Sequence, residues 1–227
     1  MSNAAANPPL QRAPELRGQT VVVIGGSAGI GLETARRARA EGADLILIAR
    51  DPDRLRRVGL ELGASTAAFD ATNFEELGKF FNGLSKPIDH VLVTGPGPYY
   101  APLAQVDIEA ARRSLDAHIL LPLVVARDAA SKVRPGGTLL FFGGTGSRRT
   151  AAGRAFTAAL TAALPAMTKS LALEVAPVRV NLIAAGFADV GLAGIAALAV
   201  HLMTNTAVTG ATFDIDGGQQ LIPPSSG

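Results

Sequence analysis

The sequence predicts an α/β fold, in which a doubly wound parallel sheet of about seven strands carries helices on both faces within one domain. Short apolar runs rich in β-branched residues alternate with helical segments along the whole chain. Such alternation requires parallel strands joined by crossover helices. The composition agrees, because 48% apolar and 18% charged residues among 227 supply one large core.

A glycine-rich turn separates the first strand from the first helix. The apolar run Val21–Ile24 is typical of a buried strand, and Leu32–Arg39 consists mostly of good helix formers. Between them the chain reads G-G-S-A-G-I-G, with glycines at positions 25, 26, 29 and 31. A strand, a glycine turn and a helix in this order predict a dinucleotide phosphate site, and an ordinary β-to-α turn is the alternative.

Three glycines of this turn have separate physical roles. Gly25 lets the chain turn sharply off the strand, Gly29 lets the backbone approach a pyrophosphate, and Gly31 lets the helix pack closely on the sheet. The N–H groups at the start of the helix then point at the anion. The predicted phosphate contacts therefore also include Ser27, Ala28 and Ile30.

The next elements continue the alternation. Asp44–Ala49 is a second buried strand, and a charged helix follows it to about Leu62. Thr66–Phe69 is a short third strand, after which Asn73 caps a helix whose first turn carries two glutamates, as the helix dipole favours. Val91–Thr94 is the fourth strand, and it runs into a Gly-Pro-Gly-Pro segment.

The second half of the chain contains the longer helices. We expect, in order, a helix at Asp107–Val133, a strand at Thr138–Phe142, a helix at Gly153–Val175, a strand at Val178–Ile183, a helix at Leu192–Met203 and a strand at Ala211–Ile215. Pro122 and Pro165 lie inside the two long helices and lack an N–H, so we expect both helices to bend.

The composition and the termini exclude several classes of protein. The chain has no cysteine, which excludes disulfides and thiolate metal sites and fits a reducing cytoplasm. The net charge of +2, the lack of tryptophan and the presence of only two tyrosines argue against nucleic acid as the main partner. No signal peptide or membrane span is expected, since Leu192–Met203, the longest apolar candidate, is too short. We expect a flexible tail at residues 1–17 and a single domain at 18–227.

Motifs spread along residues 18–222 resemble those of the short-chain dehydrogenase/reductase family. The glycine turn matches the family's T-G-x-x-x-G-I-G pattern, with Ile24 in the place of the threonine. T-G-P-G at 94–97 stands where the family has N-N-A-G, and R-V-N at 179–181 and D-G-G at 216–218 match its later signatures. The resemblance implies a Rossmann fold, a nicotinamide dinucleotide cofactor and oxidation or reduction of a small-molecule carbonyl or alcohol. It also implies cofactor contacts at Asp70, Ala71, Thr94, Gly95 and Gly186.

The residue at the end of the second strand bears on which cofactor is bound. NAD sites place Asp or Glu there to accept a hydrogen bond from the ribose 2′-OH, but this chain has Arg50. A guanidinium cannot accept that bond, and it can donate two parallel N–H bonds to a 2′-phosphate. NADP(H) is therefore the favoured cofactor. Asp51 follows directly and keeps NAD(H) as the alternative, with Arg50 then a solvated strand end.

The catalytic residues of the family are replaced. The family uses Asn, Ser, Tyr and Lys, and its Tyr and Lys lie four residues apart on one helix face, where the ammonium lowers the pKa of the phenol. In this chain His118, Gly144, Phe156 and Leu160 occupy the four places. Phe156 has no proton to give and Leu160 cannot tune one, so we expect impaired proton transfer.

Polar side chains near the replaced places are candidates for a substitute. His118 and Thr145 are the predicted catalytic residues, and Arg148 lies on the same turn as Thr145. Each has a structural alternative: His118 as a neutral side chain in an apolar helix, Thr145 as a hydrogen-bonding member of the turn, and Arg148 as a solvated or interface cation.

The segment that forms a substrate lid in the family is much shortened here. Gly186–Asp189 begins it, yet the helix expected from Leu192 follows within a few residues, which confines the lid to about 187–194. Water is then not excluded in the usual way. The resemblance also implies a homodimer or homotetramer, with an alanine-rich face on the helix at Gly153–Val175 that permits close helix approach.

These observations leave three functions open. The first is an NADP-dependent oxidoreductase with atypical catalytic groups. The second is a cofactor-binding regulatory or scaffold protein of the same fold that has lost turnover, and the third is an isomerase or lyase. The resemblance favours the first as a class, whereas the replaced catalytic residues favour the second on mechanism.

Overall fold

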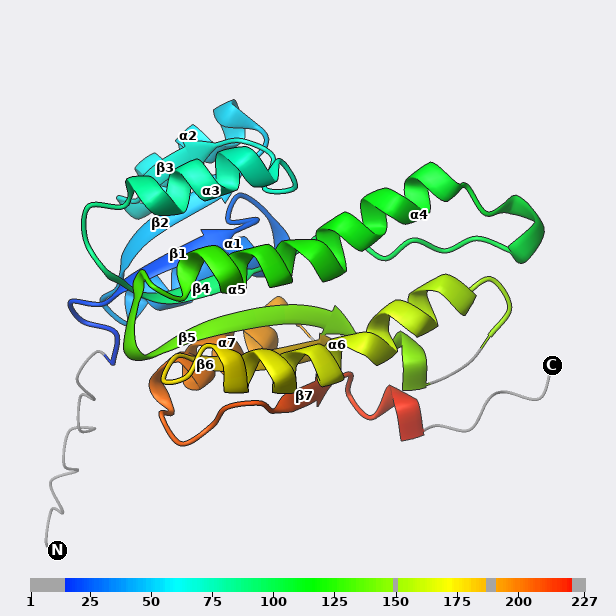
Figure 1. Ribbon diagram of the computed structural model, residues 1–227. Helices are drawn as coiled ribbons and strands as arrows, with labels where there is room; N and C mark the ends of the chain where they lie inside the picture. Colours follow the sequence, from blue (N-terminus) through cyan, green and yellow to red (C-terminus); the bar gives the residue numbers. More distant parts are fainter. Residues whose placement is uncertain (1–14, 149–150, 187–190, 222–227) are drawn as a thin grey trace, which may run out of the picture.

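A parallel sheet of seven strands forms the middle layer of the molecule (Figure 1). The computed structural model describes residues 15–148, 151–186 and 191–221. The strand order is β3-β2-β1-β4-β5-β6-β7, and all neighbouring strands are parallel. The strands are β1 (Thr20–Ile24), β2 (Asp44–Ala49), β3 (Ser65–Ala68), β4 (Ile88–Val93), β5 (Val133–Gly144), β6 (Arg179–Ala185) and β7 (Thr212–Ile215). The predicted doubly wound fold is confirmed, and the strand order reverses between β1 and β4.

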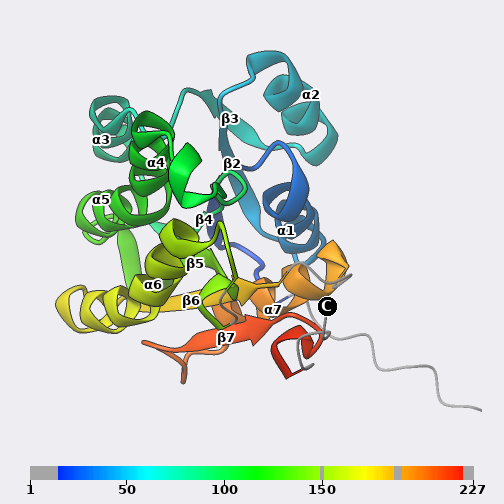
Figure 2. The ribbon, with the colours of Figure 1, turned by 90° about the vertical axis from the view of Figure 1, so that its right-hand side faces the viewer.

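Helices cover both faces of this sheet, as Figure 2 shows. One face carries α1, α2 and α7, and the other carries α3, α5 and α6, with α4 continuing the line of α5. Their bounds are α1 (Gly29–Ala40), α2 (Pro52–Leu62), α3 (Phe74–Gly83), α4 (Ile108–Leu115), α5 (Leu121–Ala129), α6 (Ala155–Glu174) and α7 (Leu192–Thr204). Val21 and Val23 of β1 face one core, and Val22 and Ile24 face the other, so the strand is apolar on both sides.

The predicted helix at Asp107–Val133 is wrong in both its continuity and its end. A π-helical segment, η2 (Asp116–Leu120), lies between α4 and α5, and Pro122 stands in the first turn of α5. Pro122 lacks the N–H that a continuous α-helix needs, and a π turn absorbs the missing bond. The chain leaves the helix after Ala129, and β5 already begins at Val133, which pairs with Ile88 beside a register shift.

The domain starts earlier than expected. Most of the predicted tail at residues 1–17 lies outside the described residues, but Leu16 is fully buried in the core on the α1 side of the sheet. Its N–H donates to the carbonyl oxygen of Glu41 at 3.0 Å. An isolated apolar residue gave no periodic signal, and its burial follows from the turn that leads into β1.

α6 is longer than Leu192–Met203, the apolar stretch singled out in the sequence. It has 20 residues and is long and apolar enough, by length and composition, to cross a membrane. Leu160, Leu164 and Leu171 of this helix pack into the core between the sheet and α5. A helix that covers a sheet meets the same test of length and composition. Pro165 lies within α6, as predicted.

Candidate functional site

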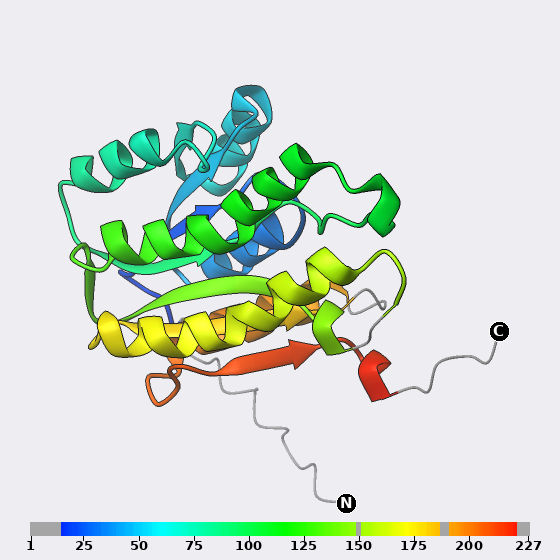
Figure 3. The same cartoon turned by 45° about the vertical axis from the view of Figure 1, so that its right-hand side comes forward.

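The candidate site lies at the carboxyl edge of the parallel sheet, the edge to which the β7 arrow points in Figure 3. The glycine turn leaves β1 at this edge. Gly25 adopts a φ of +83°, and its N–H donates to the carbonyl oxygen of Ile48 at 2.9 Å. A Cβ atom at Gly25 would overlap the hydroxyl of Thr94, and one at Gly31 would overlap the carbonyl oxygen of Gly25. The turn therefore tolerates no side chain at either position.

Gly29 differs from the other two glycines because it faces open space. Its φ is +53°, and a Cβ atom there would meet no atom within 4 Å. Ala28 precedes it as the N-cap of α1 and offers no side-chain hydrogen bond to the first turn. The predicted contacts Ser27, Ala28, Gly29 and Ile30 are all at least partly exposed. The start of α1 thus leaves room and free N–H donors for an anion.

The start of α1 also differs in charge from the starts of the next three helices, α2, α3 and α4. Asp51, Asn73 and Asp107 cap α2, α3 and α4 through side-chain hydrogen bonds, and each of these helices carries an acidic residue in its first turn. α1 has neither a side-chain cap nor an acidic first turn. An incoming phosphate would meet the positive end of this helix dipole without competition from a carboxylate.

Thr94 stabilises the glycine turn through hydrogen bonds to the end of β1. Its Oγ1 donates to the carbonyl oxygen of Ile24 at 2.9 Å, and its backbone N–H reaches the same oxygen at 3.0 Å. The side chain thus joins the ends of β1 and β4 under the glycines. Gly95 follows at the exposed surface, where a Cβ atom would lie 3.5 Å from Nε2 of His118.

At the end of β2 the two neighbouring charged residues have different tasks. The side chain of Arg50 is 74% exposed, and its Nη1 lies 4.0 Å from Oδ2 of Asp70. Asp51 instead accepts a hydrogen bond from the Arg54 N–H at 3.0 Å as the N-cap of α2. That backbone bond is the main reason why the pKa of Asp51 is lowered. Arg50 is therefore the side chain that remains available beside a bound ribose.

Asp70 and Gly186 shape the two flanks of the site. Oδ1 of Asp70 accepts hydrogen bonds from the Thr72 N–H at 2.9 Å and the Thr72 hydroxyl at 2.8 Å, and the adjacent Ala71 is buried. A Cβ atom at Gly186 would overlap the side chain of Asp216, so the end of β6 lies close to the segment after β7. Residues 187–190 of the predicted lid lie outside the described residues, and α7 begins at Leu192.

Apolar side chains occupy the two places where the family has its catalytic tyrosine and lysine. Phe156 packs edge-on against Tyr99, with ring centroids 5.8 Å apart, and Leu160 is buried in the core. Gly144 ends β5 beside α6, where a Cβ atom would lie 3.6 Å from Cγ2 of Thr161. The structure thus brings α6 and the end of β5 together, as predicted, without an acid between them.

Two buried hydroxyls in α6 were missed in the sequence. Thr157 and Thr161 each follow a replaced position by one residue and lie four apart, which is the signal that the sequence offered. The Thr157 hydroxyl donates to the carbonyl oxygen of Tyr99, and the Thr161 hydroxyl donates to that of Thr157 at 2.8 Å. Both protons are held by the main chain: the Thr157 hydroxyl ties α6 to the loop after β4, and the Thr161 hydroxyl bonds within α6.

The predicted substitute residues also have structural partners. The ring nitrogens of His118 lie 2.9 Å from the carbonyl oxygen of Ser114 and 3.1 Å from that of Pro96, which joins the π segment to the loop after β4. The buried Thr145 donates its N–H to the carbonyl oxygen of Ala185 at 3.2 Å. The His118 ring thus bonds to main-chain carbonyl oxygens, whereas the Thr145 bond comes from the backbone and not from the hydroxyl.

Arg148 is held away from catalysis by an ion pair. Its Nε and Nη2 donate to the two carboxylate oxygens of Asp214 at 3.0 and 2.9 Å. This bond raises the pKa of Arg148 and lowers the pKa of Asp214. Within the described ranges, no three His, Asp or Glu side chains gather into an arrangement suited to a metal ion.

Sequence comparison finds relatives along most of the chain. A family model described as enoyl-(acyl carrier protein) reductase matches residues 25–197. The short-chain dehydrogenase/reductase ATR9 of Stachybotrys chlorohalonatus is 28% identical over 189 residues, which cover 76% of this chain and 75% of that protein. The cyclic-di-GMP-binding biofilm dispersal mediator protein of Escherichia coli is 27% identical over 176 residues, with coverages of 76% and 74%.

Solved structures share the fold over almost the whole described chain. The crystal structure of BdcA in complex with NADPH has a TM-score of 0.82 and 25% identity, and the match covers 89% of this chain and 95% of that one. A short-chain dehydrogenase from Burkholderia cenocepacia in complex with NADP has a TM-score of 0.82 at 22% identity, with coverages of 89% and 98%. At that identity the second likeness establishes the fold alone.

Proposed function

Since this chain belongs to the short-chain dehydrogenase/reductase family, we propose that it is an NADP(H)-binding oxidoreductase of a carbonyl or alcohol whose proton delivery is impaired. One observation carries the proposal: the start of α1 is uncapped and uncharged, and Gly29 faces open space beside it. The residues fit the pyrophosphate of a dinucleotide, because backbone N–H donors are free there and no side chain blocks the approach.

The end of β2 favours the phosphorylated form of the cofactor. Arg50 is free to donate to a 2′-phosphate, whereas Asp51 is committed to the N-cap of α2. The solved complex of BdcA with NADPH, a structure of the same fold, supports this choice. NADPH would supply the hydride when bound, and the residues of this chain would bind and orient it.

The residues that occupy the family's catalytic positions in this chain favour slow turnover. A positioned general acid contributes about 10²–10⁴ in rate, and neither Phe156 nor Leu160 can supply or tune a proton. His118 and Thr145 stay our proposed substitutes, although main-chain atoms already bond to both. A reduced carbonyl oxygen would then take its proton from water or from one of these weaker donors.

The test is a titration followed by an assay. NADPH and NADH are titrated by the fluorescence of the reduced nicotinamide, and a panel of carbonyl compounds is then followed by its absorbance. We expect tight binding of NADPH, weaker binding of NADH, and slow oxidation of NADPH by some of the compounds. Failure to bind either cofactor contradicts the proposal.

Replacing Arg50 tests the cofactor preference separately. We expect Arg50→Gln to weaken NADPH binding about tenfold, because a charge-assisted pair is lost, and to leave NADH binding unchanged. Arg56→Gln is the matched control, since Arg56 is an exposed arginine on α2 that pairs with Asp53. Equal losses for NADPH and NADH, or an equal effect of the control, would remove Arg50 from the cofactor site.

A second function is favoured by the loss of the catalytic residues. In a protein that binds NADP(H) without turnover, cofactor binding itself would serve the function, as in a regulatory or scaffold protein. The similarity to the cyclic-di-GMP-binding mediator protein of Escherichia coli supports this alternative. The same titration separates the two, because tight NADPH binding without oxidation by any compound favours the regulatory function.

We also propose that the protein is a homodimer or homotetramer. α6 lies beside the line formed by α5 and α4 (Figure 3). The outward side of α6 carries exposed small residues, Ala159, Ala162, Ala163 and Ala166, which permit close approach of a second helix. Near one end of α6, Leu173 is 82% exposed.

A further inference from the structure

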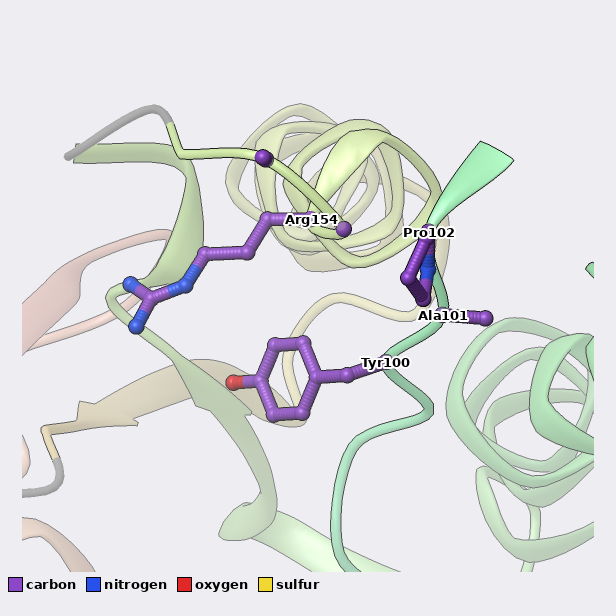
Figure 4. Close-up of a pocket in the computed structure, with 6 residues that line it drawn as sticks. Tyr100, Ala101, Pro102 and Arg154 are labelled. Atoms are coloured by element: carbon purple, nitrogen blue, oxygen red, sulfur yellow. The ribbon is translucent and has the colours of Figure 1, made fainter. Parts of the chain in front are cut away.

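A hollow of about 330 Å³ lies between two loops at the carboxyl edge of the sheet (Figure 4). One wall belongs to the loop that follows β4, and the other belongs to the segment that leads into α6. The lining residues are Tyr100, Ala101, Pro102, Ala152, Gly153 and Arg154. The volume is at the lower end of the range for small-molecule sites, roughly 300–1,000 Å³.

The two walls are fixed to each other by the main chain. The Ala101 N–H donates to the carbonyl oxygen of Gly153 at 3.2 Å. Gly153 has a φ of +76°, and a Cβ atom there would lie 3.5 Å from the backbone of Ala101 and Pro102. The Thr157 hydroxyl, which donates to the carbonyl oxygen of Tyr99, adds a second tie. These contacts fix the position of one wall of the hollow relative to the other.

The hollow combines one cation with one aromatic ring. The guanidinium carbon of Arg154 lies 5.7 Å from the centroid of the Tyr100 ring, and the two side chains extend side by side (Figure 4). Among the described residues, Arg154 has no carboxylate within ion-pairing distance. The rest of the lining is small and apolar. Burial raises the pKa of the Tyr100 phenol, so the phenol is neutral at neutral pH.

We propose that this hollow binds the carboxylate end of a small planar substrate, which rests on the proposed oxidoreductase function. A guanidinium binds a carboxylate through two parallel N–H bonds, and an aromatic face accepts a flat hydrocarbon. A single arginine matches one negative charge. Arg154 lies two residues before Phe156 in the chain, so an anion held there leaves the body of the substrate beside the replaced catalytic place.

Two probes that differ only in charge test this inference on the unmodified protein. The probes are 4-formylbenzoate and its neutral analogue 4-formylbenzamide, and their binding is measured by ligand-observed NMR with and without saturating NADP⁺. The acid should bind about five- to tenfold more tightly, a modest factor because the pair is partly open to solvent. Equal affinities, or no binding of either probe, overturn the inference.

Variants assign the difference to the hollow. Arg154→Gln should abolish the preference for the acid and leave the affinity for the amide unchanged, and Tyr100→Leu should weaken both probes. Arg17→Gln is the control, because it removes the same charge from an exposed arginine ahead of β1, outside the hollow. If Arg17→Gln removes the preference equally, the hollow is not the site.

The failure of this inference can be told from failure of the proposed function. NADPH binding is measured on the same protein samples, and Arg154→Gln should leave it unchanged. A protein that binds NADPH and shows no preference for the acid refutes the hollow alone. A protein that does not bind NADPH refutes the proposed function, and its preference for the acid is then read from the measurement without cofactor.

Discussion

His90 is a buried histidine on β4 with only one ring nitrogen bonded. Its Nε2 lies 2.6 Å from Oε1 of Gln19, whereas Nδ1 has no partner in the described part of the chain. Burial lowers the pKa of His90 to about 4, the nearby charge of Asp89 opposes the shift, and that of Arg179 adds to it. The folded protein therefore accommodates the neutral ring and resists its protonation.

This residue makes stability depend on pH. The unfolded chain binds the His90 proton near pH 6.5 and the folded chain near pH 4, so stability is full above 6.5 and falls as the pH drops toward 4. Between pH 7.5 and 5 the loss is about 2 kcal/mol. Urea unfolding at both pH values measures it, and His90→Phe should lack this part of the decrease. An identical decrease in the variant contradicts the assignment to His90.

Two glycines test the packing of the first turn. Gly31→Ala should destabilise the protein by about 1–3 kcal/mol and weaken NADPH binding, because the new methyl group overlaps the carbonyl oxygen of Gly25. Gly83→Ala, at the end of α3, is the matched control, since its Cβ atom meets nothing within 4 Å. Thermal unfolding and cofactor titration compare the two. A Gly31→Ala variant as stable as the control means that the turn can relax.

Single residues were predicted well where local backbone geometry decides their role. The need for glycine in the first turn could be predicted from spacing: Gly25 and Gly29 adopt a positive φ, and Gly31 has no room for a Cβ atom. The Arg148–Asp214 pair could not, since 66 residues separate the partners and only the sheet brings them together. The capping role of Asp51 did have a local signal, because Pro52 follows it at the first helical position.

α6 is the element that carries the altered chemistry. Leu160 of this helix is part of the core, and Phe156 packs on Tyr99. The end of β5 has kept its space as well, since a Cβ atom at Gly144 makes only ordinary contacts, the nearest at 3.6 Å. The serine, tyrosine and lysine of the family can therefore be introduced by substitution at these positions.

The combined variant Gly144→Ser, Phe156→Tyr and Leu160→Lys tests this. Its rate of carbonyl reduction should rise by about 10² or more, because a positioned acid is restored. Its stability should fall, because Leu160 is buried and a lysine there has to hold its charge in the core. NADPH oxidation and thermal unfolding are measured together. A folded variant that binds NADPH at the unchanged slow rate shows that the substrate is not positioned.

Helices and strands could be predicted where the apolar residues of a segment follow one regular pattern without interruption. β1, β2 and β6 follow from apolar runs, and α6 from its flanking glycine and strand. Pro122 predicted a bend in this region, but it did not predict the π segment that separates α4 from α5. β5 begins earlier than its apolar run because Val133 pairs across a bulge, which depends on β4.

At the scale of the whole molecule, the fold follows from the alternation of strands and helices, and the oligomer that we propose would use the exposed side of α6. We expect Ala163→Arg, on the exposed side of α6, to convert the proposed oligomer into monomers, because the long side chain prevents close helix approach. Light scattering coupled to size exclusion gives the mass. Lys79→Arg, on the exposed side of α3, is the control. A wild-type protein that is already monomeric contradicts the proposal.

The carboxylate of Asp51 links the choice of coenzyme to the anchoring of α2. If this side chain turned away from the helix toward a ribose hydroxyl, it would release the amide of Arg54, and the helix would then begin with an unpaired donor. Redesign toward the unphosphorylated coenzyme should therefore leave Asp51 where it is. An acidic residue should instead replace Arg50, one position earlier. This change removes the guanidinium and leaves the N-cap of α2 intact.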